Sequence, residues 1–169
     1  AVAELYRLFV DVHGLAADPK DGNTIYRQDH AGFYVTRNGG DTWEAAERGL
    51  PPGSVGMPGN KLTASFGFPV AIDPHTKNIF IFPLESDEYR MPVDGAFRVY
   101  RSGDGGRKWE GLGEGLPSVP TFSSVLRGAM AVDGQPMPVE VQATGTPSSV
   151  PVQVTYSRCE ATNCGLSKW

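Results

Sequence analysis

Short runs of β-branched, aromatic and other apolar residues recur along the chain, separated by turns rich in glycine, proline, asparagine and aspartate. Such runs predict β-strands. With Gly 21 and Pro 14, the composition favours many short elements joined by turns over long helices. The runs are NTIYRQ (23–28), GFYVTR (32–37), KNIFIFPL (77–84), FRVYRS (97–102), PVEVQAT (138–144) and VQVTYS (152–157).

These runs belong to an internal repeat. Each pair of runs follows a third, similar segment in which one aspartate aligns: HGLAADP (13–19), FPVAIDP (68–74) and GAMAVDG (128–134). Every unit then consists of strand, turn, strand, loop, strand, glycine-rich turn and strand, which is typical of a β-propeller blade. The sequence therefore predicts an all-β fold, a partial β-propeller of about three four-stranded antiparallel blades. We expect one domain, 1–169, with blade-like repeats at about 13–67, 68–127 and 128–169.

The glycine-rich turn is the most specific part of the repeat. Its hydroxyl and its carboxylate or amide can accept hydrogen bonds from backbone N–H groups, its glycine can adopt a positive φ, and its tryptophan can bury its ring between strands. The third copy, SRCEATNC (157–164), keeps only the serine, so the last repeat is expected to be degenerate. The two complete copies contain Thr36, Asn38, Gly40 and Trp43, and Ser102, Asp104, Gly106 and Trp109.

This pattern, Ser/Thr-x-Asp/Asn-x-Gly-x-x-Trp, resembles the Asp-box, or bacterial neuraminidase repeat. Together with "VHGLAADP", "FGFPVAIDP" and "VLRGAMAVD", it makes the stretch from His13 to Asp133 similar to bacterial WD40/YVTN/BNR-like repeat propellers of the sialidase- or glycosyl-hydrolase-like kind. The resemblance implies a closed propeller considerably longer than 169 residues, of which this chain resembles a C-terminal portion. It implies a structural role for the box residues, because boxes of this kind occur in many propellers that are not sialidases.

A partial propeller would expose strand edges and apolar blade faces, which are hazards in a soluble protein. We therefore expect self-association, with a dimer that closes a six-bladed ring as one arrangement.

Strand direction alternates within a blade, so the boxes lie at one end of it and the loops between the second and third strands lie at the other, where propeller ligands usually bind. In the second repeat this loop expands to PLESDEYRMPVDGA (83–96). Long loops on a rigid scaffold often carry binding or catalysis. Glu85, Asp87 and Glu88 are the candidate catalytic carboxylates of a glycoside hydrolase. The alternative is a solvated acidic loop with internal ion pairs.

Several other polar side chains belong to the same predicted end. They are His13, Asp29, His30, Arg90 and Asp94, which we consider candidates for ligand binding. A hydrogen-bonded structural role is the alternative for each histidine.

The net charge and the motifs of the sequence argue against several classes of function. A net charge of −4 without a basic cluster argues against nucleic-acid binding, and no apolar run reaches the length of a membrane span. No phosphate-binding loop or zinc spacing is present, so no cofactor or metal is expected. Cys159 and Cys164 are interpreted as incidental thiols, with a disulfide as the alternative, and the compartment stays open.

Three hypotheses about function remain at this stage. The first is a binding module for a carbohydrate or a protein, the second is a glycoside hydrolase, and the third is a truncated structural remnant. Whether the protein is an enzyme is left open.

Overall fold

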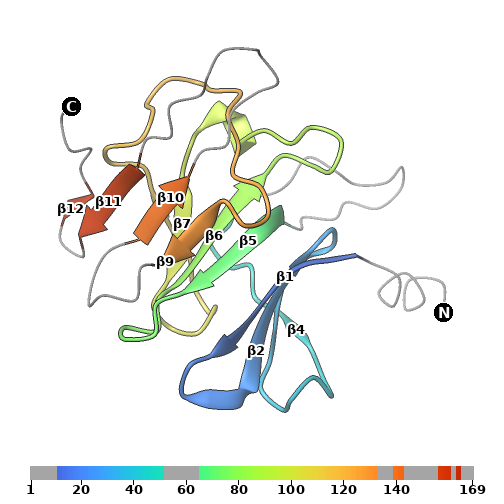
Figure 1. The fold of residues 1–169 in the computed structure, drawn as a ribbon. Helices are drawn as coiled ribbons and strands as arrows, with labels where there is room; N and C mark the ends of the chain where they lie inside the picture. Colours follow the sequence, from blue (N-terminus) through green and yellow to red (C-terminus); the bar gives the residue numbers. More distant parts are fainter. Residues whose placement is uncertain (1–10, 52–64, 133–138, 143–155, 161–162, 165–169) are drawn as a thin grey trace.

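The computed structural model describes residues 11–51, 65–132, 139–142, 156–160 and 163–164, and within them three antiparallel sheets of four strands each. The first sheet contains β1 (Val12–Asp18), β2 (Asp21–Asp29), β3 (Gly32–Thr36) and β4 (Glu44–Ala45). The second contains β5 (Phe66–Ile72), β6 (Ile79–Leu84), β7 (Val99–Ser102) and β8 (Glu110–Leu112), with a short 3₁₀ turn, η1 (Val93–Gly95), before β7. The third contains β9 (Met130–Val132), β10 (Val139–Gln142), β11 (Tyr156–Glu160) and β12 (Asn163–Cys164) (Figure 1).

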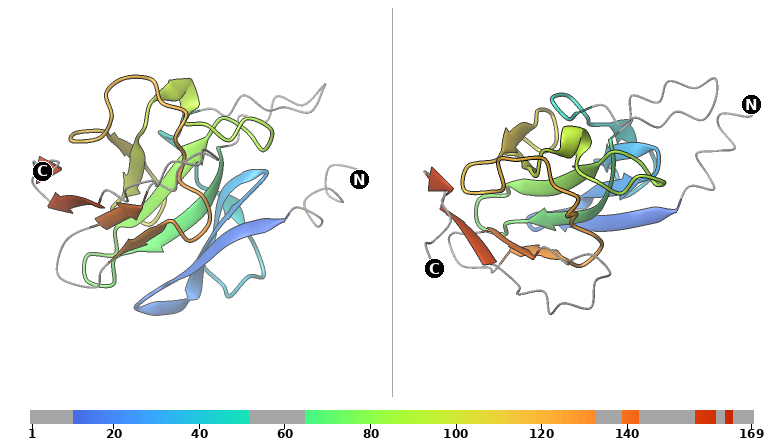
Figure 2. Two further views of the ribbon diagram at one scale, coloured as in Figure 1. Left: turned by 45° about the horizontal axis from the view of Figure 1, so that its top comes forward. Right: turned by 90° about the horizontal axis from the view of Figure 1, so that it is seen from above.

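The sheets are stacked as consecutive blades. Within each sheet, the strands pair with their neighbours in chain order. The first strand of the second sheet, β5, contacts β1, β2 and β3 on one side and β9 on the other. The views in Figure 2 show the second sheet between the other two. The fold is therefore all-β, a partial propeller as predicted, and the described residues include no helix that could span a membrane.

The first and second sheets are joined by an apolar cluster. Ile79 and Ile81 of β6 are fully buried and pack with residues of the first sheet. Trp109 is 3% exposed, and its ring meets Phe33 edge to face, with 4.9 Å between the ring centroids. Its indole Nε1–H also donates to the carbonyl of Ala46 over 2.7 Å. This residue therefore closes the seam by both packing and a buried hydrogen bond.

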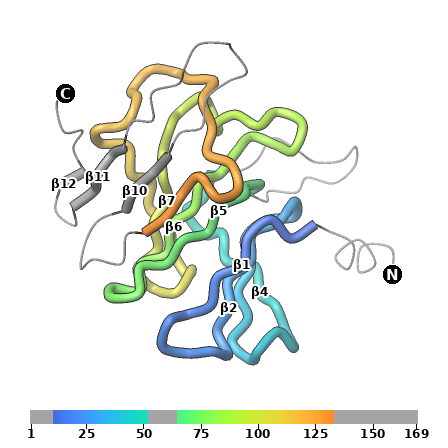
Figure 3. Tube along the Cα trace, viewed as in Figure 1, coloured from blue at the N-terminus to red at the C-terminus, as the bar shows by residue number. Residues whose placement is uncertain are grey.

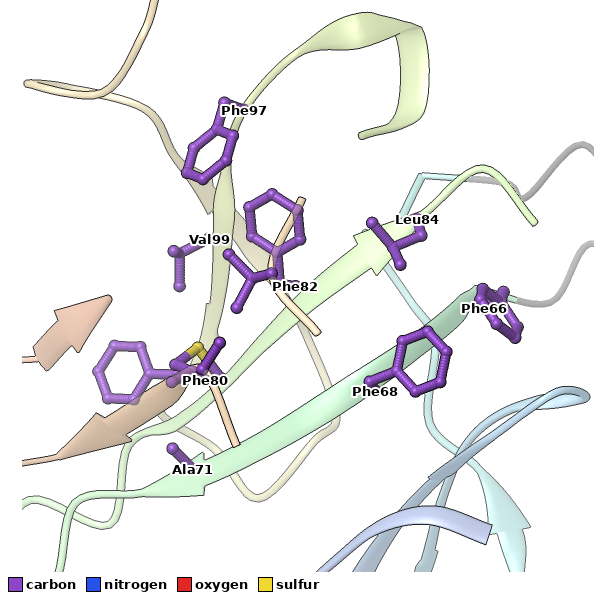
Figure 4. Packing of buried hydrophobic residues seen from close by; sticks show 11 residues of the cluster. Phe66, Phe68, Ala71, Phe80, Phe82, Leu84, Phe97 and Val99 are labelled. Carbon is purple, nitrogen blue, oxygen red and sulfur yellow. The ribbon is translucent and has the colours of Figure 1, made fainter. Parts of the chain in front are cut away.

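A second apolar cluster lies on the other side of β6. The side chains of Phe80, Phe82 and Leu84 alternate with Ile79 and Ile81, so the strand is buried on both faces. Figure 4 shows Phe82 beside Phe97 and Val99, which belong to the same cluster as Phe80 and Leu84. The cluster also includes Val125, Ala129 and Met130, which connect it to the third sheet.

The box of the second sheet is held by its own side chains. Ser102 Oγ accepts from the Gly106 N–H over 2.9 Å and donates to Asp104 Oδ1 over 2.8 Å. The same Asp104 oxygen accepts from the Lys108 N–H over 3.0 Å. Gly106 has a φ of 85°, which is the left-handed conformation that glycine tolerates best. These bonds fix the turn that places Trp109.

The box of the first sheet repeats this geometry. Thr36 Oγ1 accepts from the Gly40 N–H over 3.0 Å and donates to Asn38 Oδ1, which accepts from the Thr42 N–H over 3.0 Å. Its tryptophan has a different environment, because Trp43 is only half-buried. The prediction that both rings are buried between strands thus holds for Trp109 and is wrong for Trp43.

The described strands of the third repeat differ from those of the first two at the position of the box. β3 and β7 end at Thr36 and Ser102, the first residues of their boxes, whereas β11 continues through Ser157 to Glu160. Cys159 of β11 then pairs in register with Cys164 of β12. Asp133, the aspartate aligned in the third repeat, lies outside the described residues.

The packing of Trp109 leads to a stability prediction. Trp109→Ala would open a cavity between the first two sheets and leave the Ala46 carbonyl without its donor, so we expect a loss of about 3–5 kcal/mol. Lys108→Ala is the control, because Lys108 is exposed and contributes to the box through its backbone; its effect should stay within about 0.5 kcal/mol. Urea unfolding monitored by circular dichroism measures both. Equal stability of the two variants would contradict the role given to Trp109.

Candidate functional site

The candidate site lies at the end of the sheets opposite the box turns. In Figure 3 the box turns are at the bottom, and the loop that follows β6 and the orange loop that follows β8 are at the top. These two loops are tied together, because the Thr121 N–H donates to the Gly95 carbonyl over 3.0 Å. The end opposite the box turns therefore consists of loops that are hydrogen-bonded to each other.

Two histidines from the first sheet meet the start of β5 at this end. The ring of His13 stacks on Phe68 with 4.4 Å between centroids and an interplanar angle of 22°. It also meets His30 edge to face at 4.3 Å. His13 Nδ1 lies 2.8 Å from the carbonyl oxygen of Gly67 and, because a carbonyl only accepts, this nitrogen carries a proton. The structure thus brings together two of the residues selected from the sequence.

Two arginines approach the same phenyl ring. The guanidinium carbons of Arg90 and Arg127 each lie 5.3 Å from the Phe68 centroid, within the range of a cation–π interaction. Arg90 Nε also donates to the Asp87 carbonyl over 3.0 Å. Arg127 has a φ of 39°, an uncommon conformation for a residue with a long side chain. We call His13, His30, Phe68, Arg90 and Arg127 the Phe68 cluster. Arg127 had not been selected from the sequence, because its segment VLRGAMAVD (125–133) was interpreted only as part of the repeat.

The charges around His13 favour its neutral form. Burial lowers the pKa of His13 below its ordinary value of 6.5, and the charges of His30 and Arg127 lower it further, against the opposing effects of the Gly67 carbonyl and of Asp11. A bound anion would offset this repulsion. The cluster is therefore suited to a negatively charged group.

Asp29, also selected from the sequence, orders the turn beside His30. Its Oδ1 accepts from the Ala31 N–H over 2.7 Å, and its Oδ2 lies 2.9 Å from Arg27 Nε. The residue is 1% exposed, and burial raises its pKa above the ordinary value despite these partners. Its contacts serve the β2–β3 turn, which positions the histidine ring.

A second carboxyl with a raised pKa, that of the half-buried Glu47, was missed by sequence reasoning. Its Oε1 accepts from the Phe33 N–H over 3.1 Å and from the Ser65 N–H over 2.8 Å, so it links β3 to the start of β5. Gln28 supports the same link by donating from Nε2 to the Ser65 carbonyl over 2.7 Å. Burial raises the pKa of Glu47, and the nearby Asp29 carboxylate raises it further. Glu47 opens the segment ERGLP (47–51), but the matching segment GEGLP (113–117) of the second repeat begins with glycine, so the role of Glu47 emerges only from the packing of the sheets.

The candidate catalytic carboxylates are on the loop that follows β6. The Glu85 N–H donates to the Met91 carbonyl over 2.8 Å and closes a small hairpin. Asp87 and Glu88 are exposed near its tip, and Asp94 is exposed within η1. The same loop brings Arg90 to the Phe68 cluster. Across the described residues, no group of three or more histidines, cysteines, aspartates or glutamates is arranged to hold a metal ion.

Comparisons with known proteins point to one fold. No family model and no curated protein matches the chain. Solved structures do, including one described as the crystal structure of an ancestral GH74 enzyme, with a TM-score of 0.52 and 16% sequence identity over 90% of this chain. The chain spans 18% of that enzyme's length. At this identity the likeness shows the fold alone, which is similar to that of a glycoside hydrolase with a propeller architecture.

The raised pKa of Glu47 leads to a pH prediction. The native state binds this proton more tightly than the unfolded state, so the stability that it contributes is present below the ordinary pKa of 4.5 and is lost as the pH rises through the native pKa. Glu47→Gln can accept the same two hydrogen bonds without a charge. Relative to the original protein, its free energy of unfolding should therefore rise across this pH window.

The measurement is urea unfolding at a series of pH values, with the exposed Glu114→Gln as the matched control. The control should follow the pH profile of the original protein. A difference between Glu47→Gln and the original protein that stays constant with pH would show that the buried charge carries no such cost.

Proposed function

We propose that this chain is a carbohydrate-binding unit of a propeller related in fold to glycoside hydrolases, and that its Phe68 cluster binds an anionic group of the glycan. The observation that carries the proposal is the convergence of Arg90, Arg127 and the His13 imidazole on the buried Phe68 ring, with His30 against His13. A carboxylate and a sulfate share the chemistry that such a cluster recognises.

The arginines are held before a ligand arrives. Phe68 is 2% exposed, so it provides a fixed surface on which both guanidinium groups rest. The left-handed backbone of Arg127 costs on the order of 1–2 kcal/mol, and such strain is often stored where a side chain must be held in place. Preorganised cations lose less conformational entropy on binding.

The neighbouring loops supply a surface suited to a sugar. Tyr89 is 55% exposed on the loop that contributes Arg90, and Phe122 is 79% exposed on the loop that contributes Arg127. Exposed aromatic rings beside a few polar groups are typical of ligand sites. The GH74 likeness adds support for a carbohydrate over a protein ligand.

The hydrogen bonds and the exposure of the carboxyl groups support a binding function over hydrolysis. Asp29 and Glu47, whose pKa values are raised, accept backbone N–H bonds: those of Asp29 order the β2–β3 turn and those of Glu47 link the first two sheets. Asp87 and Glu88 are exposed near a loop tip rather than buried in a water-excluding site. A hydrolase that uses Glu85, Asp87 and Glu88 remains the competing function.

The test is binding to a panel of glycans in matched neutral, carboxylated and sulfated forms, followed by calorimetry. We expect anionic glycans to bind and Arg90→Gln with Arg127→Gln to weaken binding at least about tenfold, equivalent to about 1.4 kcal/mol. Arg107→Gln, an exposed arginine of a box turn, should bind unchanged. The carboxylated and sulfated arms distinguish the two anions.

Three outcomes would overturn the proposal. Equal affinity for neutral and anionic glycans would show that the arginines do not recognise an anionic group. The absence of binding to any glycan would show that the ligand is not a carbohydrate. Glycan hydrolysis that is lost in Glu85→Gln, Asp87→Asn or Glu88→Gln would establish the hydrolase instead.

A further inference from the structure

The turn of the first box contains the one asparagine of this sequence that precedes a glycine. Asn38 is followed by Gly39, and both residues are exposed to water. Because glycine has no Cβ, its backbone nitrogen can approach the side-chain carbonyl carbon of the residue before it without a clash. Asparagine is among the thermally labile residues, and in an unconstrained chain it loses its amide most readily before glycine. Larger residues follow the other asparagines, which are Asn23, Asn60, Asn78 and Asn163.

Hydrogen bonds within the box hold the Asn38 side chain in one orientation. Its Oδ1 accepts from Thr36 Oγ1 over 2.8 Å and from the Thr42 N–H over 3.0 Å. Its Nδ2 donates to Thr42 Oγ1 over 2.9 Å. A backbone N–H only donates, so its contact with Asn38 identifies which end of the amide is the oxygen. The side chain is therefore restrained for as long as the turn keeps its shape.

The backbone nitrogen that would attack the amide is held as well. The Gly39 N–H donates to the Asn23 carbonyl over 2.9 Å. Loss of this proton would break the hydrogen bond and place a negatively charged nitrogen against a carbonyl oxygen, which is unfavourable. The next N–H, that of Gly40, donates to Thr36 Oγ1 over 3.0 Å. The closed turn thus restrains both atoms of the bond that deamidation must form.

The second box shows that the turn accepts an aspartate at this position. Asp104 is the equivalent residue, and it too precedes a glycine. Its Oδ1 accepts from Ser102 Oγ over 2.8 Å and from the Lys108 N–H over 3.0 Å. These bonds are equivalent to the two that Asn38 Oδ1 accepts in the first box. An aspartate formed from Asn38 can therefore keep both.

We propose that Asn38 is a site of spontaneous deamidation, which the closed box turn suppresses and which opening of the turn exposes. The Gly39 nitrogen bonds to Asn38 Cγ, the Cγ–Nδ2 bond breaks, and the proton of the Gly39 N–H passes through solvent to Nδ2, which leaves as ammonia. Water then hydrolyses the resulting succinimide. The sum is one water consumed and one ammonia released, without oxidation or reduction, and the chain gains one negative charge. This proposal does not depend on the proposed carbohydrate binding.

The two products of hydrolysis affect the turn differently. Cleavage of the new bond to Cγ gives aspartate and leaves the backbone unchanged. Cleavage of the bond to the backbone carbonyl carbon gives isoaspartate, which inserts an extra carbon into the main chain between Thr36 and Gly40. The bond between the Thr36 hydroxyl and the Gly40 N–H closes the turn, so we expect the isoaspartate form to lose it.

The test is the rate of deamidation at Asn38 in the full chain at mildly alkaline pH, measured by mass spectrometry of the peptide that contains it. We expect the reaction in the urea-unfolded chain and a rate at least about tenfold lower in the folded chain, because only the open turn reacts. Thr36→Val removes the hydroxyl that closes the turn and should raise the rate in the folded chain about tenfold. Ser102→Ala removes the equivalent hydroxyl of the second box and is the matched control, which should leave the rate at Asn38 unchanged.

A second measurement examines the aspartate product. Asn38→Asp should keep the melting temperature within about 2 °C of the original protein, and a larger loss would show that the box does not accept the product. The absence of deamidation in the unfolded chain would overturn the proposed site, and equal rates in the folded and unfolded chains would overturn its suppression by the turn. An equal increase in Thr36→Val and Ser102→Ala would show that global unfolding, and not the first box, controls the reaction.

Discussion

The seam between the first and second sheets depends on the placement of Trp109. Its ring fills the space beside Phe33, and its indole N–H satisfies a buried carbonyl at Ala46, so the second sheet can approach the first in only one register. Hydrogen bonds from Ser102 and Asp104 fix the turn that precedes it. A local turn motif thereby sets the relation between two sheets.

The candidate site is a consequence of this seam. His13 comes from β1 and Phe68 from β5, and they meet because the inner strands of the two sheets lie side by side. Glu47 strengthens the same junction by accepting N–H bonds from β3 and from the residue before β5. The cluster at the loop end and the tryptophan near the box end therefore belong to one packed boundary.

The fold is similar to a propeller of the glycoside hydrolase class, and within it Asp29 and Glu47 accept hydrogen bonds from backbone N–H groups. Desolvation raises the pKa of both groups, of which Asp29 is buried at the β2–β3 turn and Glu47 is half-buried at the seam. The positively charged groups converge instead around Phe68. This arrangement is the basis of the proposed recognition of an anion.

The sequence by itself determined the four-stranded repeat, the box turns and the end at which the candidate ligand residues lie. Such features depend on bonds within a few residues, as between Thr36 and Gly40, and on strand alternation. The role of Glu47 and the inclusion of Arg127 were decided by tertiary structure. The clearest case is the pair of tryptophans, which share one motif yet differ in burial: the motif shapes the turn, but only a neighbouring sheet can remove the ring from water.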